Sequence, residues 1–167
     1  PASSVGMIGG LLAQLSRQTG HRLWPKAFRW KELDEEQKAI RLEIVYILDQ
    51  YAVVLFLIGD PNPLPMFYSV VAGLNIAETM EDTPALSNVY AQMGAIMGFI
   101  PIRSQAEYYT EQWRILNERF NHPGYFVSAA INLATMESGM GLWDLVEERM
   151  EKVVEICNEI GNNRQAG

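Results

Sequence analysis

Apolar side chains recur along this chain at the three- and four-residue spacing of amphipathic helices, with little of the alternation that is typical of strands. A first helix is expected over 7–15, ended by Thr19 and Gly20. The capping-box pattern at 34–37 predicts a long helix towards Ile58. Prolines, glycines and capping residues divide the remainder of the chain. The further helices expected from these stops cover 64–80, 83–99, 103–120, 125–138 and 142–160.

The stops between these helices recur at a fixed interval. Asp82, His122 and Asn162 are spaced by 40 residues, and Pro61 and Pro101 share that offset. Helix pairs with such a period are typical of α-solenoids, in which each hairpin buries its apolar face on its neighbours. The alternative is an irregular helical bundle with coincidental spacing. The sequence therefore predicts an all-α fold, an α-α superhelix of about three hairpins over 42–167 (43–81, 83–121 and 123–161), preceded by an N-terminal helix and connector over 1–41.

The last two hairpins resemble tetratricopeptide-like repeats. In their first helices the pattern of large and small side chains falls on Tyr90, Met93, Gly94 and Met97, and then on Ala130, Leu133 and Ala134. Ala106 and Val146 take the matching positions of the second helices. Two residues depart from the pattern, since Glu137 stands at an apolar position and Trp113 at a small one. The resemblance implies helix crossings at which the residues of the pattern are buried.

A second resemblance covers most of the chain. It rests on Arg-Leu-Trp-Pro at 22–25, Leu-Asn-Ile-Ala-Glu at 74–78, the run 90–94, the run 106–109 and Gly-Leu-Trp at 141–143. In this order the segments resemble the helical-repeat region that follows the P-loop ATPase module of large multidomain signalling proteins, including some class III nucleotide cyclases. The resemblance implies a cytoplasmic sensor or scaffold segment without a catalytic site. Because the chain starts at Pro1 without Met, we expect it to be a piece of a larger protein.

Composition narrows the class of protein. Apolar residues make up 49% and charged residues 20% of the 167 residues, which excludes an intrinsically disordered chain. With 13 basic and 20 acidic residues the net charge is -7, which argues against a general polyanion binder. The single cysteine, Cys157, rules out an internal disulfide and fits a reducing compartment. The longest strongly apolar run, 51–59, is too short to span a membrane.

Motifs for catalysis and ligand binding are missing from the sequence. No P-loop pattern occurs, and two histidines with one cysteine cannot make a convincing zinc site. His122 is expected to be a turn or capping residue, His21 has no evident carboxylate partner, and Cys157 is expected to be a buried thiol. The glutamates near the C-terminus are expected on a solvated face, partly offset by Arg149 and Lys152. We therefore expect no enzyme activity, no cofactor and no metal site in this chain.

The first helices of the three hairpins carry no lysine or arginine over 43–59, 83–99 and 123–139. In a tetratricopeptide-like stack these helices line the concave face, so a neutral groove is expected there. A groove that grips a peptide's terminal carboxylate needs cations, which favours a neutral, partly apolar peptide or a small molecule as the partner. The alternative is that these helices are simply buried. The residues expected to line the groove are Tyr51, Asn88, Gln92, Ala95, Ser128, Asn132 and Thr135.

A basic and aromatic segment precedes the hairpins. Residues 17–31 contain no acid, three aromatic residues (Trp24, Phe28 and Trp30) and five cations: Arg17, Arg22, Lys26, Arg29 and Lys31. Such a composition can contact nucleic acid by stacking and charge neutralisation. It can equally be a connector whose tryptophans fill the core. We favour the connector, because a short basic stretch without a binding fold is a weak signal.

Together these features favour a non-catalytic helical-repeat module that mediates protein–protein or interdomain contacts in a larger cytoplasmic signalling regulator. The alternative is a small-molecule-sensing domain with a neutral, partly apolar pocket on the concave face. A nucleic-acid contact through 17–31 is a third and weaker hypothesis. Neither a membrane nor a cofactor is expected among the partners.

Overall fold

The protein is described by a computed structural model over residues 4–28, 33–80, 82–100 and 103–161. Every regular element within these ranges is a helix, which confirms the expected all-α class. The chain divides into two compact units, Pro1–Asp82 and Thr83–Gly167, here called unit 1 and unit 2. Each unit is described by itself.

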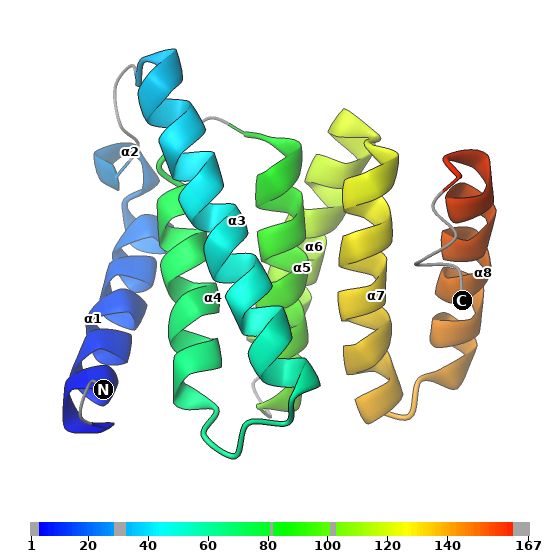
Figure 1. Ribbon diagram of the computed structural model, residues 1–167, viewed down its shortest axis with the longest axis horizontal. Helices are drawn as coiled ribbons and strands as arrows, with labels where there is room; N and C mark the ends of the chain where they lie inside the picture. Colours follow the sequence, from blue (N-terminus) through cyan, green and yellow to red (C-terminus); the bar gives the residue numbers. More distant parts are fainter. Residues whose placement is uncertain (1–3, 29–32, 81, 101–102, 162–167) are drawn as a thin grey trace. The chain divides into compact units, whose positions relative to one another are not determined.

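Unit 1 is built around one strongly apolar helix. Its helices are α1 (Ser4–Leu23), α2 (Pro25–Phe28), α3 (Glu35–Leu57) and α4 (Leu64–Ala77). Helix α4 packs against both α1 and α3 (Figure 1), and all of its residues over 69–75 are buried. A helix that is apolar all round is expected to be enclosed by its neighbours. Gly10 allows α1 to approach closely, because a Cβ added there would lie 3.2 Å from the ring of Tyr68.

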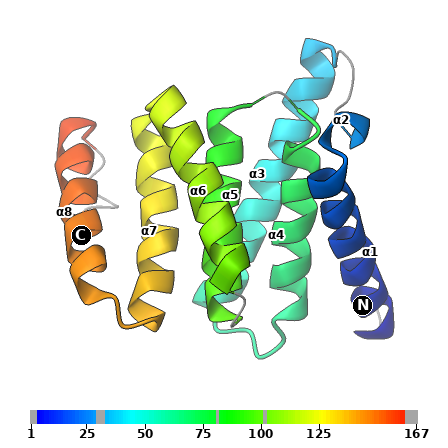
Figure 2. The same cartoon turned by 180° about the vertical axis from the view of Figure 1, so that it is seen from behind.

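Unit 2 consists of two helical hairpins. Its helices are α5 (Pro84–Phe99), α6 (Arg103–Phe120), α7 (Pro123–Gly139) and α8 (Trp143–Glu159). Helix α5 packs against α6 and also against α7, and α7 packs in turn against α8 (Figure 2). The two first helices of the hairpins, α5 and α7, therefore lie side by side, while α6 barely touches α7. These pairs correspond to the hairpins expected over 83–121 and 123–161.

Local side-chain chemistry explains where the helices begin. The Asp34 carboxylate accepts a hydrogen bond from the backbone N–H of Gln37 at 2.7 Å, which caps α3. The Thr83 hydroxyl does the same for α5. His122 accepts from the N–H of Tyr125 at 3.3 Å, so the expected capping role of this histidine is confirmed. A proline follows both Thr83 and His122 at the first helical position, where its missing N–H costs nothing.

Two helix ends differ from those expected. Helix α1 does not stop before Thr19 but continues to Leu23. The Thr19 hydroxyl bonds back to the carbonyl of Leu15 at 3.0 Å instead of ending the helix, and the last turn is held against α4. Helix α4 ends at Ala77 rather than near Met80, because the N–H groups of Thr79 and Met80 bond to carbonyls three residues back, as in a tightened final turn.

The grouping of the N-terminal segment also differs from the expected division after residue 41. Helix α1 packs along α4, and α3 packs on α4 as well, so residues 1–82 form one compact unit. The N-terminal helix therefore covers a face of the first hairpin instead of standing apart as an extension. The boundary between unit 1 and unit 2 lies between Asp82 and Thr83, where the sequence predicts a hairpin to begin.

The residues of the repeat pattern lie at helix crossings in unit 2. Met93, Gly94, Ala106, Leu133 and Ala134 are buried, and Val146 is half-buried. A Cβ added at Gly94 would lie 3.0 Å from the Thr110 hydroxyl oxygen and 3.6 Å from the carbonyl oxygen of Ala106. The crossing of α5 and α6 is therefore closed by small residues, as the resemblance to tetratricopeptide-like repeats implies.

Enlarging a side chain at this crossing is expected to destabilise unit 2. Ala106→Leu should lower the free energy of unfolding by about 1–3 kcal/mol, because the added atoms must displace α5. Denaturant unfolding followed by circular dichroism measures the change. Ser104→Leu is the matched control on an exposed position of α6, and its effect should stay within about 0.5 kcal/mol. An unchanged midpoint for Ala106→Leu would show that the crossing is not tightly packed.

Candidate functional site

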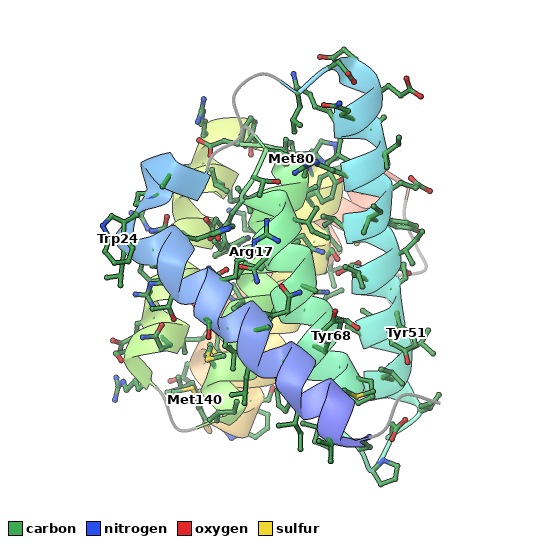
Figure 3. All side chains as sticks on the ribbon, turned by 90° about the vertical axis from the view of Figure 1, so that its left-hand side faces the viewer. Arg17, Trp24, Tyr51, Tyr68, Met80 and Met140 are labelled. Carbon is green, nitrogen blue, oxygen red and sulfur yellow. The ribbon has the colours of Figure 1, made fainter. Side chains whose placement is uncertain are left out.

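The residues expected to line a groove are divided between the two units and between core and surface. In unit 2, Asn88, Gln92 and Ala95 on α5 are all buried. On α7, Ser128, Asn132 and Thr135 are half-buried, and the hydroxyl of Thr135 bonds to the carbonyl of Ile131 in its own helix. Tyr51 belongs to α3 of unit 1, where it is about half exposed and points away from α4 (Figure 3). The burial on α5 agrees better with the alternative in which the first helices form core.

The basic segment lies only partly within the residues that the structure describes. Arg17, Arg22 and Trp24 are exposed, with Trp24 at 64%. Lys26 lies in α2, and its side chain is outside the described part, as is that of Phe28. Arg29, Trp30 and Lys31 lie outside the described residues altogether. Trp24 does not fill the core, which was the role expected of the tryptophans in a connector.

A chain of polar contacts joins α1 to α4 inside unit 1. The side-chain amide of Asn75, which is completely buried, donates to both the carbonyl and the side-chain oxygen of Gln14, each at 2.8 Å. Further along, Gln18 donates to the Glu78 carboxylate at 3.2 Å, and His21 Nδ1 lies 2.8 Å from its other oxygen. The expectation that His21 has no carboxylate partner is therefore wrong. We call this set the α1–α4 polar seam.

The burial of the polar seam assigns it a structural role. Gln18 and His21 are buried, and the side chain of Glu78 is only 12% exposed. Beside them, Arg41 of α3 donates to the hydroxyl of Thr79, so the C-terminal end of α4 is tied to both neighbouring helices. Buried polar groups of this kind specify the register of two helices, since any slip leaves donors and acceptors without partners.

A second polar cluster explains the two residues of unit 2 that depart from the repeat pattern, Glu137 and Trp113. Glu137 stands at a position where an apolar residue was expected, and Arg149 of α8 binds it through two hydrogen bonds of 2.9 and 2.6 Å. The guanidinium of Arg149 also lies 5.3 Å from the ring centre of Trp113, which in turn stands 6.2 Å from Phe126. Arg149 is therefore part of the packing between three helices and not of a solvated face.

The exposed charges of α6 form ion pairs along one helix face. Arg114 donates hydrogen bonds to Glu111 and to Glu118, one turn before and after it. Accepting hydrogen bonds from Arg114 lowers the pKa of the Glu111 carboxyl, and donating to both carboxylates raises the pKa of Arg114. Because these groups are solvated, the pairs contribute little to stability, and they define no site.

The surface feature that stands out is a row of apolar side chains along α3. Its six members lie four or three residues apart in strict alternation, and each is between 40% and 67% exposed: Ile40, Ile44, Ile47, Tyr51, Val54 and Ile58. We call this row the α3 stripe. The side chains by which α3 contacts the core of unit 1, Val45, Ala52 and Leu55, lie on another face of the helix. The stripe is therefore apolar surface that unit 1 leaves uncovered.

The stripe was not identified from the sequence. Helix α3 is apolar on almost every side after Glu43, so residue type alone does not separate the face that packs on α4 from the face that remains exposed. The spacing of the stripe is that of the a and d positions of a heptad repeat, but Val45, Leu48, Ala52 and Leu55 on the packed face have the same spacing. No signal in the sequence therefore separates the two faces.

The described residues contain no group of three or more histidine, cysteine, aspartate or glutamate side chains placed to hold a metal ion. Within those same ranges, no helix has both the length and the apolar character needed to cross a bilayer. Cys157 is completely buried, as expected.

Comparisons with protein-family models, with curated proteins and with solved structures find no match to this chain. The resemblances noted in the sequence thus remain expectations. The functional argument rests on the contacts and exposures given above.

Proposed function

We propose that this chain is a non-catalytic helical-repeat module that binds protein partners within a larger cytoplasmic signalling regulator. The observation that carries the proposal is the α3 stripe. Contiguous exposed apolar surface is uncommon on monomeric proteins and marks sites of interaction when it is found. The five large apolar side chains aligned on α3, with Ile58 at its C-cap, are a surface of this kind.

The pairing of helices supports a tetratricopeptide-like superhelix as the framework. Helices pair in chain order, α3 with α4, α5 with α6 and α7 with α8, and the first helices α5 and α7 pack on each other. This is the arrangement by which helical hairpins stack into a solenoid. The fixed 40-residue interval between the stops at Asp82 and His122 agrees with it.

The alternative of a small-molecule sensor has less support. Its pocket would need the polar groups of the first helices to face an open cavity, yet Asn88 and Gln92 are each only 6% exposed. Ser128 and Asn132 are half-buried on α7. No specific observation favours this alternative over a protein-binding surface.

Photocrosslinking in the cells that produce the parent protein tests the proposal. A photoreactive phenylalanine analogue placed at Ile47 is expected to form discrete adducts with protein on irradiation, because that position stands at the centre of the stripe. The matched control carries the same analogue at Glu151, an exposed position on α8 outside the stripe. The analogue is also placed at Val54, a second member of the stripe. Absence of protein adducts from both positions would refute a protein-binding role for this surface.

A further inference from the structure

The geometry of the α3 stripe is that of one half of a coiled coil. Its members follow one another at intervals of four, three, four, three and four residues, so they keep to a single seam along the helix. A second helix lying along this seam could insert its own apolar side chains between those of α3. The stripe continues from Ile40 to Ile58 without a polar interruption. A helix of ordinary length would therefore find apolar partners along the whole contact.

The charges beside the stripe select the partner. One edge of α3 has Glu36, Glu43, Gln50 and Leu57 at seven-residue intervals, and all four are exposed. Glu36 lies one turn before the stripe begins, and the other three flank it. The cations of α3 are directed elsewhere: Lys38 lies 3.0 Å from the carboxylate of Glu35, and Arg41 donates to Thr79. The outer edge of the seam is therefore acidic towards the N-terminus of α3 and uncharged beyond Glu43, and a complementary helix has lysine or arginine where it flanks Glu36 and Glu43.

The charges favour a basic helix over a second copy of this chain. A second α3 helix brings no lysine or arginine to the outer edge of the seam, because Lys38 and Arg41 contact Glu35 and Thr79. A basic helix supplies a cation for Glu43, which a second copy does not, and this difference selects between the two partners.

We propose that the α3 stripe is the docking site of a basic amphipathic helix with a heptad pattern of apolar residues. This inference rests on the proposed function and names the chemistry of the partner. The apolar seam provides the contact area, and Glu36 and Glu43 set the polarity of the flanking residues. Unit 1 supplies a rigid support, because Val45, Ala52 and Leu55 fix α3 on the core of this unit.

Two synthetic helices provide the probe. Both match the stripe in length and have leucine at their a and d positions, but one has lysine and the other glutamate at the e and g positions. Repulsion between identical flanks keeps either helix from pairing with itself. The full chain is expected to bind the lysine helix at least about tenfold more tightly than the glutamate helix, measured by fluorescence anisotropy.

Substitutions in the chain locate the site. Ile47→Lys should weaken binding of the lysine helix by about tenfold or more, since it removes a central apolar contact and adds a repelling charge. Leu145→Lys is the matched control, because it makes the same change at an exposed apolar position of α8. Both side chains are exposed, so circular dichroism should show unchanged helicity and melting for both variants.

A charge exchange tests the selection of the partner directly. The double variant Glu36→Lys/Glu43→Lys should lose its preference for the lysine helix and bind the glutamate helix instead. This inversion is not expected from a non-specific attraction of cationic peptides to an acidic protein. Such an attraction would leave the glutamate helix unbound in every variant.

Three results would overturn the inference. Binding of the lysine helix that survives Ile47→Lys would place the contact elsewhere. Equal binding of both helices would remove the role of the acidic edge. Sedimentation showing a dimer of the chain that Ile47→Lys dissociates would make a second copy the occupant. In each case protein adducts from the photoreactive residue at Ile47 would still uphold the proposed function, whereas their absence would refute that function itself.

Discussion

Replacing Glu137 by leucine is expected to lower the free energy of unfolding by about 3–5 kcal/mol, because it leaves a cation without its partner in the interior of unit 2. The Glu137 carboxylate is 5% exposed and the side chain of Arg149 is 18% exposed. The two hydrogen bonds between them, of 2.9 and 2.6 Å, are the compensation for removing both charges from water. Denaturant unfolding of the whole chain, monitored by circular dichroism, measures the loss.

A paired substitution separates the ion pair from the packing around it. Glu137→Leu combined with Arg149→Met replaces both charges by apolar groups of similar size and should recover much of the stability. Glu148→Leu on the exposed face of α8 is the control, with an expected effect within about 0.5 kcal/mol. If Glu137→Leu were as mild as this control, the buried pair would not be what holds α8 on α7.

The helices could be predicted from the sequence because the signals that end and begin them are local. Thr83 and Pro84 lie next to each other and act within one turn, and Asp34 acts on an N–H three residues away. The pattern of small residues at Gly94 and Ala106 likewise predicted a close crossing of two consecutive helices. Such features depend on short stretches of chain, so reading along the sequence captures them.

The polar contacts in the interior could not be predicted, because their partners are distant in sequence. His21 and Glu78 are 57 residues apart, and neither neighbourhood shows that the other exists. In the sequence, Glu137 is an acid at an apolar position of the repeat pattern, and Arg149 was expected on a solvated helix face. In the structure the two side chains form an ion pair. Pattern reading judges each helix alone, whereas the pairing of buried charges is decided by tertiary packing.

The burial of the candidate groove residues could not be predicted for a related reason. A neutral helix surface can be a groove or a part of the core, and only the neighbouring helices decide which. Asn88 and Gln92 on α5, which were expected to line a groove, are buried. Ile44 and Ile47 on α3, another first helix without lysine or arginine over 43–59, are exposed. Residue type determines how unfavourable it is to expose a side chain to water. The packing of the helices determines which side chains are exposed.

Replacing Glu78 by leucine is expected to lower the free energy of unfolding by roughly 2–4 kcal/mol, because two buried donors lose their acceptor at once. Gln18 Nε2 and His21 Nδ1 reach the two oxygens of this one carboxylate at 3.2 and 2.8 Å. Both donors belong to the last turns of α1, so the damage should be concentrated there. Hydrogen exchange should show reduced protection of α1 amides while those of α6, in unit 2, are unchanged.

Two further variants identify the cause of this loss. Glu78→Gln keeps one side-chain oxygen as an acceptor and should therefore lose less stability than Glu78→Leu. Glu36→Leu removes an exposed carboxylate from the first turn of α3, where it interacts with the helix dipole, and should lower stability by no more than about 1 kcal/mol. If Glu78→Leu proved as mild as Glu36→Leu, α1 would be held by its apolar contacts alone. In that case Gly10 and Tyr68, at the other end of the α1–α4 contact, would be the place to disrupt it, since a Cβ at Gly10 would lie 3.2 Å from the ring.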